Sequence, residues 1–592
     1  MNFKNEIKLF YRQITEMLSQ IWVIDKRLAF LNLVSKIILA LLPVAILYIT
    51  KQLIDLLSKS TTSFQEILWL IVIFASVQII SGIINQWSEY SSTLFQQKVT
   101  DSFSEKIIRK ASNVDYDYFE KPLFHNTLHI VQQQALYRVG QFLPAINALI
   151  ASGLSLLFLV FFFISIKAYF FLAVIVVAGP ITFNKWLQGK KLSNLEFSLA
   201  PKEREANYLF QILTGIQWAK ELRSFRFGKS FGSRLFSLRN HIASEKKKIH
   251  KSALSKNMLV DVLEVILLAF VIGYMSFLTL NKTMTIGLFV LYLQGFQRMQ
   301  TSSKSFFQSF LQIFQLRIFF RNLIDFFSLE ETTEKNLNAT IMPNEFNELE
   351  LKNISYTYHH AKNPTINGIS ITAKRGQIIA IVGENGSGKS TLVKILSRLY
   401  HPQQGEIKIN QQEINTFDFA SFYDNTAFFF QDYEKYFLEA VQNIHFDLSA
   451  DSTKKEKAII AAKLSGADEF VQKLSKDYNT KLGSIFEGSE QLSGGQWQKL
   501  ALARIFYKKT KLVVLDEPSS SLDAFSELRL YEQIKNNLQD KIVILISHRL
   551  YNLKIADFIY VMKDGRIVQE GTFDELANSK GLFHEMFEKQ KI

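Results

Sequence analysis

The sequence predicts a multidomain membrane protein, in which an all-α domain of six membrane helices is followed by an α/β domain. Six long apolar runs all lie before residue 300, and short alternating strands and helices begin only near residue 348. The charge divides at the same place, because residues 1–330 carry 36 basic and 20 acidic residues whereas residues 331–592 carry 32 and 34. A uniformly basic nucleic-acid-binding protein would not divide in this way, so we expect no nucleic-acid partner.

Cysteine is absent from the 592 residues. Its absence excludes disulfide frameworks, cysteine-based zinc sites and cysteine nucleophiles. Hydrophobic residues make up 48% of the chain, and the mean hydropathy is +0.07. Such an apolar composition is unusual for a soluble protein of this length, and it excludes a disordered chain.

Each of the six apolar runs is expected to form a membrane helix. A helix rises about 1.5 Å per residue, so about 20 residues cross the ~30 Å hydrocarbon core. The alternative, buried helices of a large soluble protein, is disfavoured because segments such as SLLFLVFFF lie inside longer apolar stretches. The fourth and sixth runs are short and need polar continuation. The runs are residues 28–50, 67–86, 143–166, 168–184, 257–280 and 284–297.

The charges of the loops predict the topology. Residues 185–256, between the fourth and fifth runs, hold 16 basic and 5 acidic residues. Basic loops stay in the cytoplasm, so both ends of the chain are expected there, in an integral protein of the cytoplasmic (inner) membrane. No cleavable signal peptide is expected, because the start, MNFKNEIKLFYRQ, is charged and mixed and the first apolar run is too long for the apolar part of a signal peptide.

A phosphate-binding motif follows a strongly apolar, strand-like segment of the α/β domain. The strand QIIAIV, residues 377–382, runs into GENGSGKS, which fits the pattern GxxxxGK[ST] between a strand and a helix. The glycines let backbone N–H groups surround phosphates, and the helix N-terminus adds partial positive charge. We expect Lys389 to reach the β- and γ-phosphates and Ser390 to bind Mg²⁺. The nucleotide-binding residues are Gly383, Glu384, Asn385, Gly386, Ser387, Gly388, Lys389, Ser390 and Thr391.

A second apolar strand, LVVL at residues 512–515, ends in two carboxylates. Asp516 is suited to holding Mg²⁺, and Glu517 is suited to polarising the attacking water. Adjacent carboxylates at a strand end can instead cap the next helix. The phosphate-binding motif makes that alternative a poor one.

The sequence LSGGQ at residues 492–496 resembles the signature motif of ATP-binding cassette (ABC) proteins. Four further matches follow the order of that family, and they are Tyr358, Gln431, Ser521-Leu522-Asp523 and His548. Six membrane segments before one such domain resemble an ABC exporter half-transporter. The implied fold is a six-helix ABC exporter transmembrane domain at 1–329, a linker at 330–347 and a P-loop NTPase nucleotide-binding domain at 348–592.

The resemblance implies that ATP and Mg²⁺ bind between two such domains. Tyr358 stacks on adenine, Gln431 helps to hold Mg²⁺ beside Ser390 and Asp516, and catalysis depends on Glu517, His548 and Gln431. The second domain supplies Ser493, Gly494, Gly495 and Gln496 in trans, with Ser521, Leu522 and Asp523 as its D-loop. Because this chain carries one cassette, it must act as a dimer. The intact motifs favour a homodimer, and a heterodimer stays possible.

The implied function is ATP-driven export of an amphipathic cargo, which is a lipid, a drug or a small peptide product. An importer built on the exporter fold is the alternative. A non-transport ABC ATPase acting on nucleic acid or ribosomes is disfavoured because such chains lack membrane segments. Residues 115–122 and 216–231 suggest a docking surface. The helical hairpins that end near Tyr116–Phe124 and Gly215–Phe227 resemble the coupling helices that dock on cassettes near Gln431.

Candidate cargo contacts are weakly indicated. Asp261 and Glu264 lie one turn apart in the fifth run, and Lys36 lies in the first. Intramembrane charges are costly and often functional, but both acids are close enough to the cytoplasm to face Lys256 or Lys251. The spacing of Phe306, Phe310 and Phe314 predicts one helix face, which we interpret as helix packing.

Overall fold

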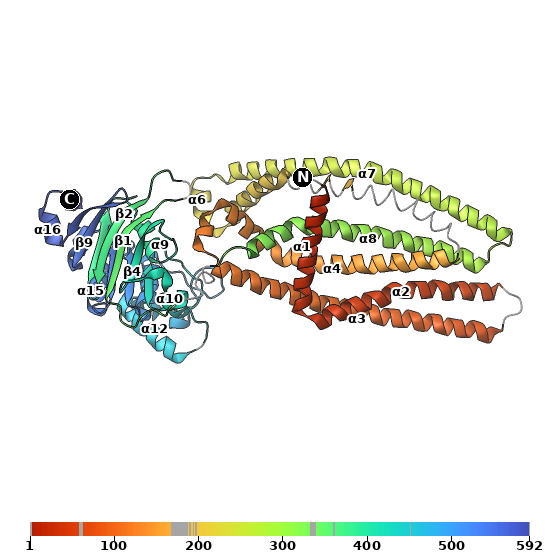
Figure 1. Ribbon diagram of the computed structural model, residues 1–592, viewed down its shortest axis with the longest axis horizontal. Helices are drawn as coiled ribbons and strands as arrows, with labels where there is room; N and C mark the ends of the chain where they lie inside the picture. The colour runs from red at the N-terminus through yellow and green to blue at the C-terminus, as the bar shows by residue number, and fades with distance from the viewer. Residues whose placement is uncertain are drawn as a thin grey trace. The chain divides into compact units, whose positions relative to one another are not determined.

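The computed structural model describes residues 3–58, 63–166, 187–188, 191–192, 195, 198–331, 339–358, 361–449 and 451–590. These residues form two compact units. Unit 1 comprises residues 1–112 and 122–329, and unit 2 comprises residues 113–121 and 330–592. Figure 1 shows unit 1 as long helices and unit 2 as sheets covered by shorter helices.

The described part of unit 1 is helical. A helix is expected here, because in lipid every backbone polar group must be satisfied within its own segment. The second helix begins where Asp25 accepts a hydrogen bond from Leu28 N, at 3.0 Å. The elements are α1 (Phe3–Ile24), α2 (Lys26–Leu57), α3 (Phe64–Asn113), α4 (Pro122–Ile166), η2 (Ile216–Trp218), α6 (Ala219–Ser224), α7 (Gly228–Leu280) and α8 (Ile286–Phe327).

Four stretches of the described residues are long and apolar enough to cross a membrane. They are α2, α3, α7 and residues Tyr137–Phe163 of α4. They contain the first, second and fifth predicted runs and most of the third, residues 143–166. The fourth run, 168–184, lies outside the described residues. The sixth run starts α8, which does not reach the same apolar length, so its membrane crossing stays a prediction.

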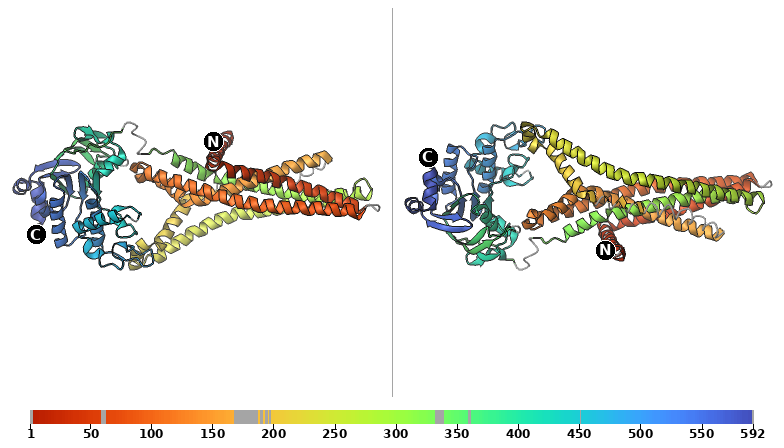
Figure 2. Two further views of the ribbon diagram at one scale, coloured as in Figure 1. Left: turned by 90° about the horizontal axis from the view of Figure 1, so that it is seen from below. Right: turned by 90° about the horizontal axis from the view of Figure 1, so that it is seen from above.

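Three helices of unit 1, α2, α4 and α8, pack against one another. Figures 1 and 2 show α4 and α8 running side by side. Close packing is possible at Gly295 of α8, where an added Cβ would lie 2.2 Å from the ring of Phe163. Phe306 similarly lies against Gly153 of α4, with 3.2 Å to an added Cβ. The packing interpretation of the phenylalanine face therefore holds for Phe306.

Unit 2 contains two sheets. The six-stranded sheet has the order β10-β9-β3-β8-β7-β6, with β10 antiparallel to its neighbour and the other pairs parallel. The four-stranded sheet is antiparallel, with the order β2-β1-β4-β5. The strands are β1 (Glu348–Tyr356), β2 (Ile366–Lys374), β3 (Ile378–Gly383), β4 (Gln404–Ile409), β5 (Gln412–Glu413), β6 (Thr426–Phe429), β7 (Leu512–Asp516), β8 (Ile542–Ile546), β9 (Phe558–Lys563) and β10 (Arg566–Gly571).

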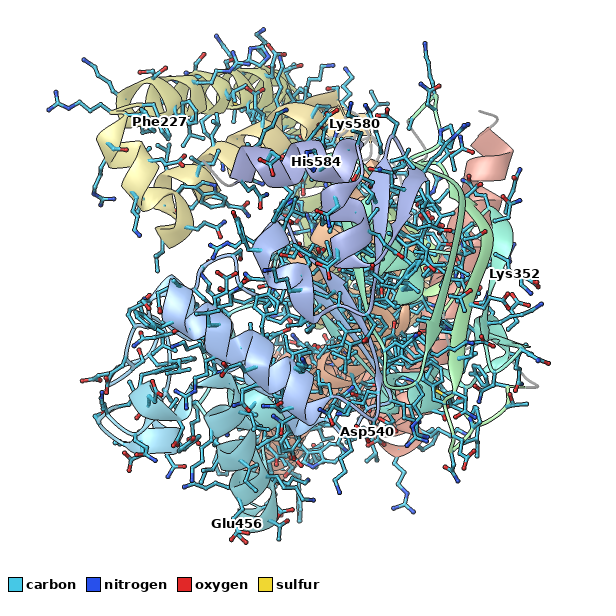
Figure 3. The ribbon with its side chains drawn as sticks, turned by 90° about the vertical axis from the view of Figure 1, so that its left-hand side faces the viewer. Phe227, Lys352, Glu456, Asp540, Lys580 and His584 are labelled. Carbon is cyan, nitrogen blue, oxygen red and sulfur yellow. The ribbon has the colours of Figure 1, made fainter. Side chains whose placement is uncertain are left out.

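The central strands β3, β7 and β8 are buried along their whole length, as expected for parallel strands covered on both faces. Figure 3 looks onto unit 2, with Lys352 on β1 and Glu456 on α12 near its periphery. The helices are η1 (Tyr116–Glu120), α9 (Lys389–Leu396), η4 (Ile414–Thr416), α10 (Phe419–Asp424), α11 (Gln442–His445), α12 (Ser452–Ser465), α13 (Asp468–Val471), η5 (Asp477–Asn479), α14 (Gly494–Tyr507), α15 (Ala524–Asn537), η6 (Leu550–Ile555), α16 (Phe573–Asn578) and α17 (Leu582–Gln590).

Two buried residues extend this core before β1. Met342 and Phe346 lie in the stretch that the sequence suggests is a linker, and both are buried in the hydrophobic core of unit 2. Residues 339–347 therefore pack as part of unit 2. The carboxyl ends of β3, β7 and β8 meet at one edge of the sheet, which is where open α/β sheets bind ligands.

Candidate nucleotide-binding site

The loop between β3 and α9 has the conformation that the phosphate-binding motif requires. Gly388 is the N-cap of α9 and has φ +102°, a backbone conformation that favours glycine. The Lys389 ammonium donates to the carbonyls of Gly383 and Glu384, each at 2.9 Å. Burial lowers the pKa of Lys389, and the carboxylates of Glu517 and Asp516 oppose that shift. The lysine is thus held inside the loop, where phosphate oxygens can compete for its donors.

Asp516, at the end of β7, has a buried carboxylate oxygen without a hydrogen-bond partner among the described residues. Its side chain is 3% exposed, and its Oδ1 has no hydrogen-bond partner among the described residues. Burial raises the pKa of Asp516 to about 6, and a hydrogen bond with Ser390 opposes the increase. A buried carboxylate oxygen beside a hydroxyl fits Mg²⁺, which takes one or two protein oxygens plus water and phosphate. Asp516 and Ser390 are therefore placed to hold that ion.

Three predicted catalytic residues meet at Glu517. His548 Nε2 lies 2.5 Å from one carboxylate oxygen of Glu517, and Gln431 Nε2 donates to the other at 2.8 Å. They come from three segments, which follow β6, β7 and β8. The structure thus brings together residues separated by up to 117 positions in the sequence. The carboxylate is fixed from two sides at the edge of the phosphate-binding loop.

Tyr358 belongs to an aromatic cluster beside α9. Its ring lies 5.3 Å from the ring of Tyr356 and 5.8 Å from that of Tyr400. Its hydroxyl lies 3.1 Å from the Thr391 Oγ1, which places it next to the phosphate-binding helix. This position is compatible with the stacking role expected for Tyr358.

The signature sequence starts α14. Ser493 caps this helix in a reciprocal pair with Gln496, in which each side chain bonds the other's backbone. Ser493 and Gly494 are exposed, so their polar groups face outward. Gly495 lies under Ser521, with 2.9 Å between an added Cβ and the Ser521 carbonyl oxygen.

The D-loop is fixed at both ends. Asp523 caps α15 by accepting from Ser526 N at 3.0 Å and from Ser526 Oγ at 2.7 Å. These hydrogen bonds lower the pKa of Asp523. Leu522 is buried in the core of unit 2. In this chain Asp523 therefore has a structural role, whatever it does in an assembled dimer.

The sequence motifs do not indicate a role for Gln498, a fully buried residue of α14. Its amide donates to Ser520 Oγ at 3.2 Å and accepts from Ser521 N at 2.8 Å. It therefore ties the signature helix to the D-loop. Its position five residues after Ser493 was the available signal, but nothing in the sequence shows which way its side chain points.

An ion pair beside the site, with a buried carboxylate and an exposed arginine, could not be identified from the sequence either. Glu527 of α15 pairs with Arg549, the residue after His548, and also accepts a hydrogen bond from Ser519. Glu527 is 6% exposed. The pair holds the segment that carries His548 against α15. Charged residues at these positions are indistinguishable from surface residues in the sequence alone.

The first segment expected to dock belongs to unit 2. Glu120 of η1 contacts Tyr400 and lies 3.3 Å from Lys394 Nζ on α9, and Asp115 lies 3.8 Å from His401 Nε2. The Tyr116 ring lies 5.9 Å from that of Tyr400. These contacts go to α9 and to the residues that follow it, and docking of this segment near Gln431 stays a prediction.

The candidate cargo residues of α7 have different surroundings. Glu264 is 5% exposed and lies 3.1 Å from Lys304 Nζ of α8, whereas Asp261 is exposed. The expected pairing of Glu264 with Lys256 or Lys251 is thus replaced by a link to α8. Lys36 is likewise engaged, because its ammonium donates to Ser88 Oγ of α3 at 2.8 Å. A cargo role for Asp261 and Glu264 stays a prediction.

Comparison with known proteins agrees with this geometry. Residues 366–520 match the family model described as ABC transporter. The chain is 29% identical to the subtilin transport ATP-binding protein SpaT of Bacillus subtilis, over 100% of this chain and 97% of the relative. It is 28% identical to the nisin transport ATP-binding protein NisT of Lactococcus lactis subsp. lactis, over 98% and 97%. The chain belongs to the ABC transporters.

The fold of this ABC transporter is that of a half-transporter, in which a membrane unit is fused to one nucleotide-binding unit. The structure of a bacterial Atm1-family ABC exporter with ATP bound matches it with a TM-score of 0.80 and 17% identity, over 96% of this chain and 99% of that one. The protein is an integral membrane ATP hydrolase that couples hydrolysis to transport.

Proposed function

We propose that this ABC transporter exports a peptide across the cytoplasmic membrane as a homodimer, with both ends of the chain in the cytoplasm. The observation that carries the cargo class is the match over the whole chain. Cargo contacts the membrane unit, so relatives matched over both units are the informative ones. The two relatives of that kind described above are named for subtilin and nisin transport, and both are peptide exporters.

The geometry supports hydrolysis of ATP by positioning and charge stabilisation. Lys389 and the backbone N–H groups of the loop hold the phosphates, and Tyr358 stacks on the base. Glu517 orients the attacking water and accepts its proton, while Gln431 and His548 hold the carboxylate. Phosphoryl transfer needs little covalent help from the protein, so this fixed arrangement accounts for most of the catalysis.

The residues around Asp516 support a magnesium requirement. When bound, Mg²⁺ would supply positive charge that neutralises the negative charge developing during transfer. In this chain Asp516 and Ser390 would hold the ion, with Gln431 as a further oxygen donor. Asp516 must then be ionised, which its burial and the neighbouring Glu517 and Asp432 carboxylates oppose.

The exposed signature residues support a dimer. Ser493 and Gly494 face outward from the start of α14, where hydrogen-bond donors remain available to a nucleotide on a second chain. All the motifs needed for two active sites are present in this one chain. Two identical copies can therefore supply both composite sites, which favours the homodimer.

The competing functions are less well supported. A non-transport ATPase acting on nucleic acid or ribosomes does not need four apolar helices long enough to cross a membrane. An importer would share every nucleotide-binding residue with an exporter, so the site does not separate them. Export is favoured because the whole-chain relatives are exporters.

Transport by inside-out vesicles tests this proposal. Vesicles from cells that make the chain would be incubated with a cell extract and ATP, and accumulated molecules would be identified by mass spectrometry. We expect peptides to accumulate with the wild-type chain and not with Glu517→Gln. Accumulation of lipid or drug-like molecules alone would refute the peptide cargo. Loss of preloaded peptide, instead of its accumulation, would indicate import.

A further inference from the structure

An amide-lined cavity of about 760 Å³ lies in unit 1 between α4, α7 and α8. Its volume is in the range of about 300–1,000 Å³ that ligand sites usually occupy. Glutamines dominate its polar lining, and three of them come from one helix, α8. They are Gln308, Gln312 and Gln315. None of the residues assigned to ATP, Mg²⁺ or cargo in the sequence analysis lines this cavity.

The three glutamines lie on one face of α8. At 3.6 residues per turn, positions 308, 312 and 315 lie within about 60° of one another. Positions 306, 310 and 314 occupy the opposite side, where Phe306 packs on α4. The helix therefore has an aromatic packing face and an amide face, and the amide face lines the cavity.

These amides are available to a ligand. The side-chain amides of four lining glutamines make no hydrogen bond in the part of the chain that the structure describes, and these are Gln141, Gln308, Gln312 and Gln315. Two other amides in the lining behave differently, because the side chains of Gln188 and Asn257 hydrogen-bond each other at 3.1 and 3.4 Å. Each amide both donates and accepts, which is the pattern that successive N–H and C=O groups of a peptide backbone require.

The charges of the lining have one sign. Arg138 and His250 contribute cationic or ionisable groups, and no Asp or Glu is among the described lining residues. A guanidinium binds a carboxylate by paired, charge-assisted hydrogen bonds. An acidic segment is thus preferred over a basic one.

The cavity also lies at the level where cargo would enter. Its residues on α4 begin at Tyr137, the first residue of the apolar stretch Tyr137–Phe163, and those on α7 end at Asn257, where the fifth apolar run begins. In the expected topology these positions mark the cytoplasmic boundary of the membrane helices.

We propose that this cavity binds an extended, acidic segment of the exported peptide, through the amides of α8 and Gln141 and through Arg138. The proposal rests on the proposed peptide cargo. The amides would bind the peptide backbone, and Arg138 would bind its negative charge. Neither interaction requires a particular order of side chains in the peptide.

The cysteine-free chain allows a direct test. A single Gln312→Cys substitution would be labelled with N-ethylmaleimide in the full-length protein in nanodiscs, with and without synthetic peptides. Three peptides of equal length would be compared, with alternating Ser–Asp, Ser–Gln and Ser–Lys. Gln211→Cys, an exposed position of unit 1 outside the cavity, is the matched control.

We expect the Ser–Asp peptide to slow labelling of Gln312→Cys most, the Ser–Gln peptide less and the Ser–Lys peptide least, with no effect at Gln211→Cys. Adding Arg138→Gln should weaken protection by the Ser–Asp peptide about tenfold or more, the size of a lost charge-assisted hydrogen bond. An unchanged melting temperature would verify that each variant folds.

Equal labelling of Gln312→Cys with and without the Ser–Asp peptide would overturn the proposal, as would equal protection at Gln211→Cys. The vesicle experiment separates this failure from failure of the peptide cargo. Peptide uptake without protection would refute the cavity alone, whereas absence of both would refute the cavity together with its premise.

Discussion

Glu517 is held in an unusual backbone conformation at the end of a buried strand. Its φ is +53°, which is uncommon for a residue other than glycine. Gln431 and His548 fix the two oxygens of its carboxylate. Strained residues of this kind persist where the surrounding structure over-determines them, often at functional sites.

At this residue scale, Glu517→Gln should retain ATP and lose turnover. The amide keeps the size of the side chain but cannot accept a proton from water. We expect kcat to fall by about 10²–10⁴-fold, the usual contribution of a general base, and nucleotide affinity to stay near the wild-type value. Steady-state hydrolysis and equilibrium ATP binding measure the two quantities. Glu456→Gln, a peripheral change on α12 (Figure 3), should alter neither.

The sequence motifs identify the residues that we propose to contact the nucleotide but not those that support them. Motif order and position after apolar strands indicated Lys389, Asp516 and Glu517, and the strands that precede them end at one edge of the sheet. Gln498 and the Glu527–Arg549 pair could not be found, since their roles depend on contacts between helices. A charged or amide side chain in a helix has the same appearance in the sequence whether it is buried or solvated.

At the scale of the element, α9 depends on the glycine that starts it. An added Cβ at Gly388 would lie 2.8 Å from the Thr365 carbonyl oxygen, whereas one at Gly386 would meet nothing within 4 Å. Both glycines have positive φ. Gly386→Ala should therefore cost only the conformational penalty of about 1–2 kcal/mol.

Gly388→Ala adds a clash with backbone to that penalty, so it should destabilise unit 2 more than Gly386→Ala and also abolish ATP binding. Chemical denaturation and nucleotide binding would measure the two variants. Equal effects of the two substitutions would contradict the placement of Gly388 against Thr365.

The η1 segment is expected to transmit movement to the nucleotide site. Its Glu120 contacts Tyr400 and Lys394, and Lys394 lies on the helix that starts at the phosphate-binding loop. Glu120→Gln should lower the amount of cargo transported per ATP hydrolysed, with less than about 1 kcal/mol of stability lost because the ion pair is partly exposed. Glu456→Gln, an exposed change on α12 outside this contact, serves as the control. A normal transport-to-hydrolysis ratio for Glu120→Gln would exclude this coupling role.

For the whole molecule, the composite site makes a prediction about mixed dimers. A dimer with Lys389→Ala in one chain and Ser493→Arg in the other would keep one intact site if the signature acts in trans. A dimer with both changes in one chain and a wild-type partner would have a defect in each site. We therefore expect more ATP hydrolysis from the first dimer, measured after purification with two affinity tags. The reverse order would show that each chain uses its own signature.

The architecture was predictable where local signals are strong. The length of the apolar runs predicted membrane helices, and four of them are long and apolar enough in the structure to cross a membrane. The strand–loop–helix order around the glycine-rich motif predicted the nucleotide-binding fold. The burial of Met342 and Phe346 and the assignment of residues 113–121 to unit 2 were not predictable, because they arise from long-range packing. The amide-lined cavity was not predictable for the same reason, because its residues come from helices that are far apart in the sequence.

Transport by the purified chain alone is the most direct test of ATP-driven peptide export by a homodimer. The protein would be reconstituted in proteoliposomes with its nucleotide-binding units outside, and peptides from a cell extract would be supplied with ATP and Mg²⁺. We predict that peptides accumulate inside with the wild-type chain and not with Glu517→Gln. Vigorous ATP hydrolysis without accumulation of any peptide would contradict the proposed function.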